Sequence, residues 1–390
     1  MDYTFDHTIS RENTSCVKYD QRNQIFGTKD VIPLWVADMD FATPEFIRNA
    51  IIERTAHPIL GYTFISEDTI DAAIGWMHRR HGWKVKPEWI SLCPGIVPAL
   101  NFAVLANSEP SDKVIIQPPV YTPFFAAITD HKRIVVENPL KETNGYYTMY
   151  LDHLEARFKD GAKLLILSNP HNPVGRVYTK PELDELALLT SNYGITVVSD
   201  EIHSDIIMPG SKHIPFASIS EDTANRTITF VAPSKTFNVA GLSTGIAIIP
   251  NELLRRRFNS IINSLHLSMG NIFGIEAMKA AYTHGDEWVD NLNQYLHSNL
   301  TVVNSILSNK NTAIRNQIPE GTYLSWLDFR ELRLPQNEIN RILVEVAKVG
   351  LSDGTIYGNQ GLGFQRFNAA SSRFVIESAA TSIAAAFTKW

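Results

Sequence analysis

The chain has 390 residues, enough for two or three structural units with a large buried core, which excludes the small scaffolds that need disulfides or metals to fold. Hydrophobic residues make up 44% and charged residues 19%, a composition typical of folded globular proteins and not of disordered chains. The net charge of −6, from 35 Lys and Arg against 41 Asp and Glu, argues against a nucleic acid or an anionic membrane as the main partner.

The cysteines and the N-terminus limit the compartment. Cys16 and Cys93 are the only cysteines, too few for a disulfide framework and without the spacing of a zinc site, so we expect no metal centre. The acidic N-terminus does not have the order of a signal peptide, and no window of about 18 residues is continuously apolar. We therefore expect a soluble, cytoplasmic protein.

Short β-branched runs through the middle of the chain predict strands at residues 113–116, 133–136, 164–167, 195–198, 227–231 and 245–249. Most are apolar at consecutive positions, which is typical of strands buried on both faces of a mainly parallel sheet. Helical patterns separate many of them. The clearest covers residues 181–191, with Thr179 as its N-cap and Pro181 near its start. This alternation predicts a large, doubly wound α/β domain over residues 46–285.

The two ends of the chain have a different pattern. After residue 285 we expect helices at 288–307 and 336–349 and strands at 322–329 and 373–376, which together predict a smaller α+β domain over residues 286–390. Residues 1–45 contain no strong long element. We expect them to form an N-terminal arm and part of the small domain.

A lysine and a carboxylate follow two of the predicted parallel strands. Lys235 lies just beyond the strand at 227–231, and Asp200 follows the strand at 195–198. Because the carboxyl ends of parallel strands form the ligand-binding edge of such sheets, both side chains should meet there. A desolvated lysine can form a Schiff base with a carbonyl cofactor, whereas one lysine taken alone is more often a solvated loop residue.

Asp200 has two interpretations. It could pair with the pyridinium nitrogen of pyridoxal phosphate and keep the ring an electron sink. Alternatively, it could ligate a metal together with His203 and Asp205, but the chain offers no His-Glu-x-x-His run to complete such a site.

Two turns add polar groups to this edge. The segment 168–175 is rich in Asn, Pro and Gly, which alone explains a turn, but it also holds the Asn172 amide between two prolines, where it could donate to a ring phenolate. At Gly95, a turn opens an apolar helix, whose free amides and dipole could bind a phosphate.

In this order, these segments resemble the fold-type I pyridoxal-phosphate enzymes of the class I and II aminotransferase superfamily. The matching segments are Ala37-Asp38-Met39-Asp40-Phe41-Ala42-Thr43-Pro44, Asn169-Pro170-His171-Asn172-Pro173-Val174-Gly175, Ser234-Lys235 with Gly241, and Arg366-Phe367-Asn368-Ala369-Ala370-Ser371-Ser372-Arg373. The resemblance spans nearly the whole chain and implies the PLP-dependent transferase fold, with pyridoxal 5'-phosphate as the cofactor.

The resemblance implies a role for each residue around the cofactor ring. Lys235 would bond to the cofactor and later carry the substrate's Cα proton. Asp200 would pair with the ring nitrogen, and Asn172 and His203 would hydrogen-bond the phenolate oxygen. Tyr121 would stack on the ring, although it could equally be an ordinary half-buried aromatic residue.

The phosphate and the substrate would be held by other residues. The resemblance assigns the phosphate to Gly95, Ile96, Val97 and Ser234, and to Tyr62 reaching across from a second subunit, which implies a homodimer with shared active sites. Arg373 would bind the substrate carboxylate with two parallel hydrogen bonds, unless it is only a surface ion pair. Trp35 and Ala37 would line the same pocket, Ala37 through its backbone.

Departures from the common aminotransferase pattern point to a branch of the family. Ser243 stands where many aminotransferases have an arginine, and Ala232 where they often have serine. With these changes the chain resembles the cystathionine β-lyase-like carbon–sulfur lyases. The expected reaction is α,β-elimination from an L-amino acid that carries sulfur on Cβ. An aminotransferase is the second hypothesis, because it would use the same residues, and a regulatory protein that binds pyridoxal phosphate is the third.

Overall fold

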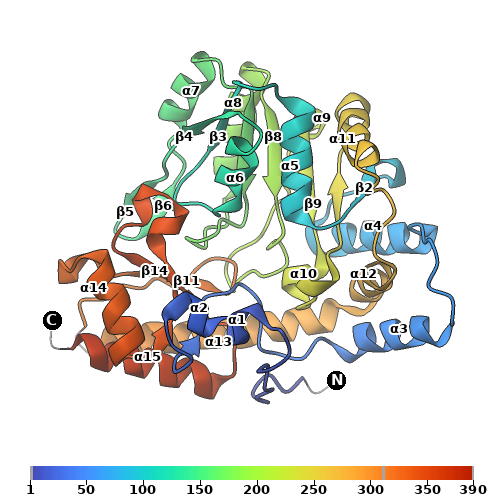
Figure 1. The fold of residues 1–390 in the computed structure, drawn as a ribbon. Helices are drawn as coiled ribbons and strands as arrows, with labels where there is room; N and C mark the ends of the chain where they lie inside the picture. The colour runs from blue at the N-terminus through green and yellow to red at the C-terminus, as the bar shows by residue number, and fades with distance from the viewer. Residues whose placement is uncertain (1–2, 310–311, 389–390) are drawn as a thin grey trace.

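The computed structural model describes residues 3–309 and 312–388 and is built around a large twisted sheet (Figure 1). Its seven strands lie in the order β2-β10-β9-β8-β7-β3-β4. Their bounds are β2 (Ile90–Cys93), β3 (Lys113–Ile116), β4 (Ile134–Glu137), β7 (Leu164–Ser168), β8 (Thr196–Asp200), β9 (Thr227–Val231) and β10 (Gly245–Ile248). Neighbouring strands are parallel except around β10, which is antiparallel to both β2 and β9. The six predicted strands are confirmed, and β2 is an addition.

Helices cover both faces of this sheet. On one face lie α5 (Ile96–Asn107), α6 (Pro123–Thr129) and α11 (Glu252–Ser264), and on the other α7 (Leu151–Lys159) and α8 (Lys180–Asn192). Along β7, Leu164 and Ile166 pack into the first layer, whereas Leu165 and Leu167 pack into the second. This explains why the strands are apolar at consecutive positions. The predicted cap of α8 is confirmed, since Thr179 forms a capping box with Glu182.

The C-terminal part carries a second sheet, in the order β11-β14-β13. Its strands are β11 (Leu324–Asp328), β13 (Ser352–Asp353) and β14 (Phe364–Asn368). The long helices α13 (Asp286–Asn309) and α15 (Arg373–Phe387) run side by side beneath it (Figure 1). The predicted helix at 336–349 begins as α14 (Gln336–Arg341), continues as a π-helical turn at Ile342–Val346, and gives way to β12 (Val349–Gly350).

One predicted strand is wrong. Residues 373–376 open α15 instead, and the strand prediction fails because three consecutive apolar residues fit either structure within so short a window. The longer pattern is helical, since Ile376, Ala379, Ala380 and Ile383 are all buried and recur at the spacing of one helix face.

The N-terminal segment contacts the C-terminal part through a strand pair. It contains α1 (Val17–Asp20) and α2 (Arg22–Phe26), and its strand β1 (Ile32–Pro33) pairs in parallel with β12. The division of the chain at residues 45 and 285 stays a prediction. Across the described residues, none of the helices combines the length and apolar character needed to cross a membrane.

Candidate active site

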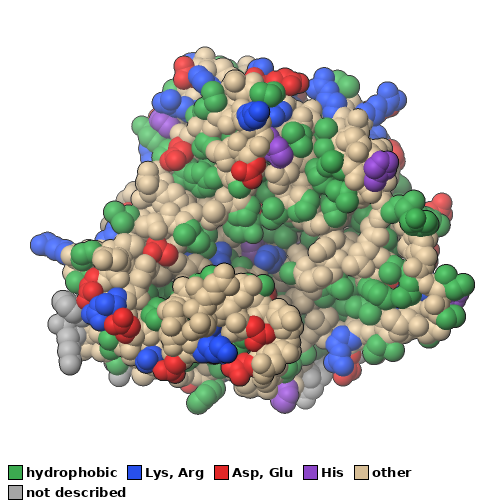
Figure 2. Space-filling model, in the orientation of Figure 1, with side chains coloured by type: hydrophobic (Ala, Val, Ile, Leu, Met, Phe, Trp, Pro, Cys, Tyr) green, Lys and Arg blue, Asp and Glu red, His purple; other side chains and the backbone are tan. Residues whose placement is uncertain are grey.

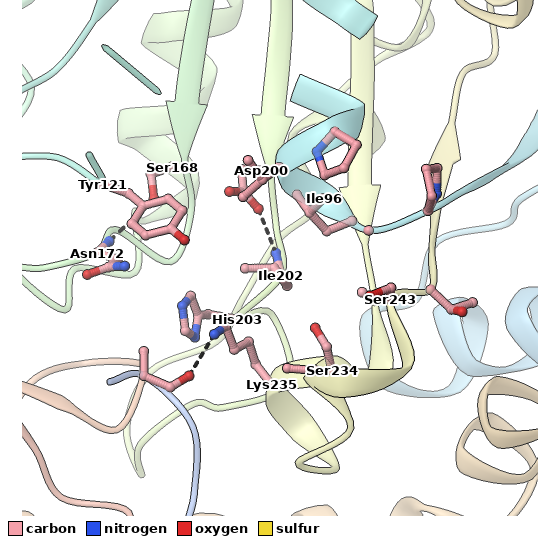
Figure 3. Close-up of a pocket in the computed structure, with 18 residues that line it drawn as sticks. Ile96, Tyr121, Ser168, Asn172, Asp200, Ile202, His203, Ser234, Lys235 and Ser243 are labelled. Atoms are coloured by element: carbon pink, nitrogen blue, oxygen red, sulfur yellow. Dashed lines mark hydrogen bonds between the residues drawn. The ribbon is translucent and has the colours of Figure 1, made fainter. Parts of the chain in front are cut away.

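A cavity of about 340 Å³ lies at the carboxyl ends of β7, β8 and β9. In Figure 2 the surface is hollowed between the part that carries the large sheet and the part that carries α1 and α2. Ten of the predicted site residues line the cavity: Ala37, Gly95, Ile96, Val97, Tyr121, Asn172, Asp200, His203, Ser234 and Lys235. Figure 3 shows that they converge from several elements distant in sequence.

Lys235 lies in the short helix α10 (Pro233–Thr236), directly after β9. Its Nζ donates a hydrogen bond to the backbone carbonyl of Ala37 at 2.6 Å. Burial of the amine, together with the nearby Arg366 guanidinium, lowers the pKa of Lys235 to about 8. Far more neutral amine therefore exists near neutral pH than for a solvent-exposed lysine, and nucleophilic attack and proton transfer both require the neutral form.

Asp200 ends β8 inside the cavity with few partners. The residue is 6% exposed, and its Oδ1 accepts one hydrogen bond, from the backbone N–H of Ile202 at 3.2 Å. Burial raises the pKa of Asp200 to about 7. A cationic group placed beside this carboxylate would compensate for the burial, and the protonated ring nitrogen of pyridoxal phosphate is such a group.

His203 has an open position on the same wall. Its Nδ1 is buried and has no hydrogen-bond partner among the described residues. Burial holds the pKa of His203 well below its usual value, so the ring is neutral and the unpartnered Nδ1 is free to bond to a ligand. Together with Asp200 and Lys235, this open nitrogen matches the polar groups around a pyridoxal ring. The described residues fit the cofactor.

The opposite end of the cavity suits an anion. Gly95 caps α5 with a φ of 108°, a backbone conformation that glycine adopts readily, and it has no side chain to occupy the first amides of the helix. The N–H groups of Ile96 and Val97 are thus available to a phosphate at the positive end of the helix dipole. Ser234 and two residues absent from the prediction, Ser243 and Thr244, add hydroxyl groups to the cavity wall.

Arg366, in β14, is a guanidinium of this site that the prediction missed. It is 5% exposed, its Nη1 donates to Asn172 Oδ1 at 3.1 Å, and its Nη2 donates to the Trp35 carbonyl at 2.8 Å. Its Nε is buried without a partner among the described residues. A buried donor left open beside Lys235 and Asn172 is suited to a carboxylate ligand.

Arg373 does not lie at this site, contrary to the prediction. It is the first residue of α15, and its guanidinium donates to the backbone carbonyl and to the hydroxyl of Ser298 in α13, at 2.9 and 2.5 Å. The chain leaves β14 and turns into α15 between the two arginines, so only Arg366 stays at the sheet. The available signal was an arginine inside a strand of otherwise buried residues, which requires a partner or a ligand.

Trp35 and Tyr62 also lie outside the lining of the cavity. Trp35 contributes its carbonyl to Arg366, while its indole nitrogen donates to the Lys18 carbonyl at 3.1 Å. Tyr62 lies in the connection between α3 (Glu45–Ala56) and α4 (Glu67–His81) and is 96% exposed. Its predicted contact with the phosphate of a second subunit stays a prediction.

The chain is similar to several known proteins. Residues 29–383 match the family described as aminotransferase class I and II. The cystathionine beta-lyase PatB of Bacillus subtilis (strain 168) is 43% identical over 385 residues, covering 98% of this chain and 100% of that protein. Cystalysin from Treponema denticola, whose crystal structure contains pyridoxal 5'-phosphate, superposes with a TM-score of 0.97 at 35% identity over the full length of both chains. The pyridoxal-phosphate-bound C-S lyase from Staphylococcus hominis gives a TM-score of 0.92 at 33% identity, covering 99% of this chain and 98% of the other.

Proposed function

Since the chain belongs to the class I and II aminotransferase family, in its cystathionine β-lyase-like branch, we propose that it is a pyridoxal-phosphate-dependent carbon–sulfur β-lyase. The reaction is α,β-elimination from L-cystathionine or a related S-substituted cysteine, which yields pyruvate, ammonia and a thiol. The observation that carries this proposal is the full-length identity of 43% to a cystathionine beta-lyase. The cavity that Lys235 and Asp200 line, with Arg366 next to Asn172 at its wall, supports it.

Each cavity residue has a task in this reaction. Bound pyridoxal phosphate supplies an electron sink that stabilises negative charge at the substrate Cα. Asp200 would keep a proton on the ring nitrogen, and Lys235 would take the proton from Cα. Arg366 would bind the substrate carboxylate through its open Nε and so fix the orientation of the Cα–H bond.

The remaining groups hold the cofactor in place. Asn172 and His203 would hydrogen-bond the ring oxygen, and Tyr121 would pack on the ring. The amides of Ile96 and Val97 would bind the phosphate, together with the hydroxyls of Ser234, Ser243 and Thr244.

We also propose that the active unit is a homodimer. The segment between α3 and α4 exposes four large apolar side chains, with Ile59 67%, Leu60 55%, Tyr62 96% and Phe64 81% exposed. Several exposed apolar side chains in one short segment are costly in water and typical of a protein interface. If a second copy of the chain covered this segment, Tyr62 of each copy would lie near the phosphate site of the other.

We also propose that the enzyme acts in the cytoplasm, where homocysteine released from cystathionine would enter methionine biosynthesis.

A pyruvate assay tests the reaction. Purified, yellow holoprotein is given L-cystathionine with no keto acid present, and pyruvate and free thiol are measured together. We expect them to form in equal amounts, and we expect the Lys235→Ala variant to form neither. Product that appears only after a keto acid is added would replace the proposal with an aminotransferase.

A further inference from the structure

The backbone carbonyl of Ala37 lies between two side chains that donate to it. Lys235 Nζ approaches at 2.6 Å and the Tyr323 hydroxyl at 2.9 Å. Figure 3 draws the first of these bonds as the dashed line from the Lys235 amine. The carbonyl therefore connects the amine of the cavity to a tyrosine that does not line it.

Asn368 fixes the peptide groups on either side of this carbonyl. Its Nδ2 donates to the Val36 carbonyl at 2.6 Å and to the Asp38 carbonyl at 2.7 Å, and its Oδ1 accepts from the Ala370 N–H at 2.8 Å. Asn368 is fully buried. Since the two flanking carbonyls are bound to Asn368, the Ala37 carbonyl is the one that remains for Lys235.

Tyr323 and Asn368 come from one rigid unit. Tyr323 precedes β11, Asn368 ends β14, and these strands pair so that Leu324 lies opposite Asn368. The backbone carbonyl of Tyr323 also accepts from the Ala369 N–H at 2.8 Å. The three-stranded sheet thus holds both donors at a fixed separation from residues 36–38.

The chemistry of the lysine gives this arrangement a purpose. An amine that removes a proton must direct its lone pair at one C–H bond, and a four-carbon side chain has many rotamers in which it does not. A hydrogen bond from Nζ to a fixed acceptor selects among these rotamers. Burial, aided by the nearby Asp38 carboxylate, raises the pKa of Tyr323 far above its usual value, so its hydroxyl stays protonated and remains a donor.

We propose that Tyr323 and Asn368 are positioning residues that hold the Ala37 carbonyl against the Lys235 amine and thereby set the direction in which the amine takes the Cα proton. The inference rests on the proposed function only in assigning proton removal to Lys235. It does not depend on the leaving group.

L-Alanine in D₂O tests the inference, because this amino acid has no leaving group and reports proton removal alone. NMR follows the exchange of its Cα hydrogen on the holoprotein. We expect Tyr323→Phe to slow exchange by about tenfold to a hundredfold, the cost of a misplaced reacting group, with unchanged cofactor content and unchanged affinity for alanine. Asn368→Asp, which replaces the two donors with acceptors, should slow it in the same way. A crystal structure of the Tyr323→Phe apoprotein should show Lys235 Nζ beyond hydrogen-bonding distance of the Ala37 carbonyl.

Tyr147→Phe is the matched control. Tyr147 is also buried, and its hydroxyl accepts from Trp326 Nε1 at 3.2 Å in a different cavity. It should therefore exchange alanine at the wild-type rate. A Tyr323→Phe rate within twofold of both wild type and this control would overturn the inference. Absence of exchange in the wild type would instead contradict the proposed function, on which the inference depends.

Discussion

Asp200 and Asp205 are buried carboxylates five residues apart, and their surroundings differ. Asp205 accepts hydrogen bonds from Trp76 Nε1 and Thr236 Oγ1, each at 3.0 Å, and pairs with His81 Nε2 at 2.9 Å. Asp200 has a single backbone N–H at 3.2 Å. Both are 6% exposed, so burial alone does not distinguish them.

The pKa values of the two carboxyl groups differ because their hydrogen-bond partners differ. Burial raises the pKa of Asp205, but the hydrogen bonds and the charge of His81 outweigh this effect, and the pKa ends below its usual value. At Asp200 burial dominates and the pKa rises to about 7. A carboxylate whose bonds are all made within the chain stabilises the fold, whereas one left short of partners is available to a ligand.

The comparison predicts that replacing Asp200 with Asn lowers the rate, whereas replacing Asp205 with Asn lowers the stability. The loss of rate is the largest effect that we expect. Asp200→Asn should lower the elimination rate by about 10²–10³-fold, because the cationic ring nitrogen loses its counter-charge. Its apoprotein should unfold no more easily than the wild type, since a poorly partnered buried charge is removed. Asp205→Asn should lower the free energy of unfolding by about 1–3 kcal/mol, because it breaks the pair with His81.

Rates per bound cofactor and urea unfolding of both apoproteins measure these effects. The rate per cofactor of Asp205→Asn should stay close to wild type. Should Asp200→Asn retain the full rate while losing stability, the roles of the two carboxylates would have to be exchanged.

The dependence of stability on pH sharpens the comparison. Between its unfolded pKa of 3.8 and its folded value of about 7, Asp200 binds more protons in the folded apoprotein than in the unfolded chain. The contribution of Asp200 to the free energy of unfolding therefore falls as pH rises from about 4 to 7, by about 1.4 kcal/mol for each pH unit. Asp205, with a lowered pKa, has the opposite sign and loses its contribution as pH falls below 3.8.

Urea unfolding of the apoproteins at a series of pH values checks the sign. The stability of Asp200→Asn relative to wild type should grow between pH 4 and pH 7 and then level off. A difference that stays constant over this range would show that the Asp200 carboxyl is not perturbed by burial.

Much of the fold was predictable because burial leaves a strong local pattern. Strands covered on both faces are apolar at consecutive positions, and β7, with Leu164–Leu167 all apolar and buried, stands out for that reason. Because parallel strands end at one edge of their sheet, residues at or just after the ends of β8 and β9, such as Asp200 and Lys235, are expected together there. By contrast, the start of α15 is ambiguous locally, since its helical spacing becomes visible only over several turns.

The parts of the site that escaped prediction depend on contacts between distant segments. Tyr323 resembles any aromatic residue next to an apolar strand, and only the folded chain brings its hydroxyl to Ala37. Arg366 and Arg373 stand seven residues apart in one motif, and their composition does not separate them. The turn between β14 and α15 decides which one lies beside Asn172 and Lys235.

Arg366 and Arg373 show the same contrast between a buried group with an open hydrogen-bonding position and a group whose bonds are made within the chain. Their substitution should give the smallest effect of the predictions made here. Arg366→Lys keeps the charge but loses the planar donor set, so the KM for L-cystathionine should rise about tenfold or more, the cost of one charge-assisted hydrogen bond. Arg373→Lys should leave KM within about twofold, because the Arg373 guanidinium bonds to the exposed Ser298 of α13, and such surface contacts contribute little. Steady-state kinetics measure both, with cofactor absorbance as the check that the site is intact. If Arg373→Lys raised KM and Arg366→Lys did not, the open Nε of Arg366 would not be the carboxylate donor, and the substrate would have to reach the cavity along the face that carries α13 and α15.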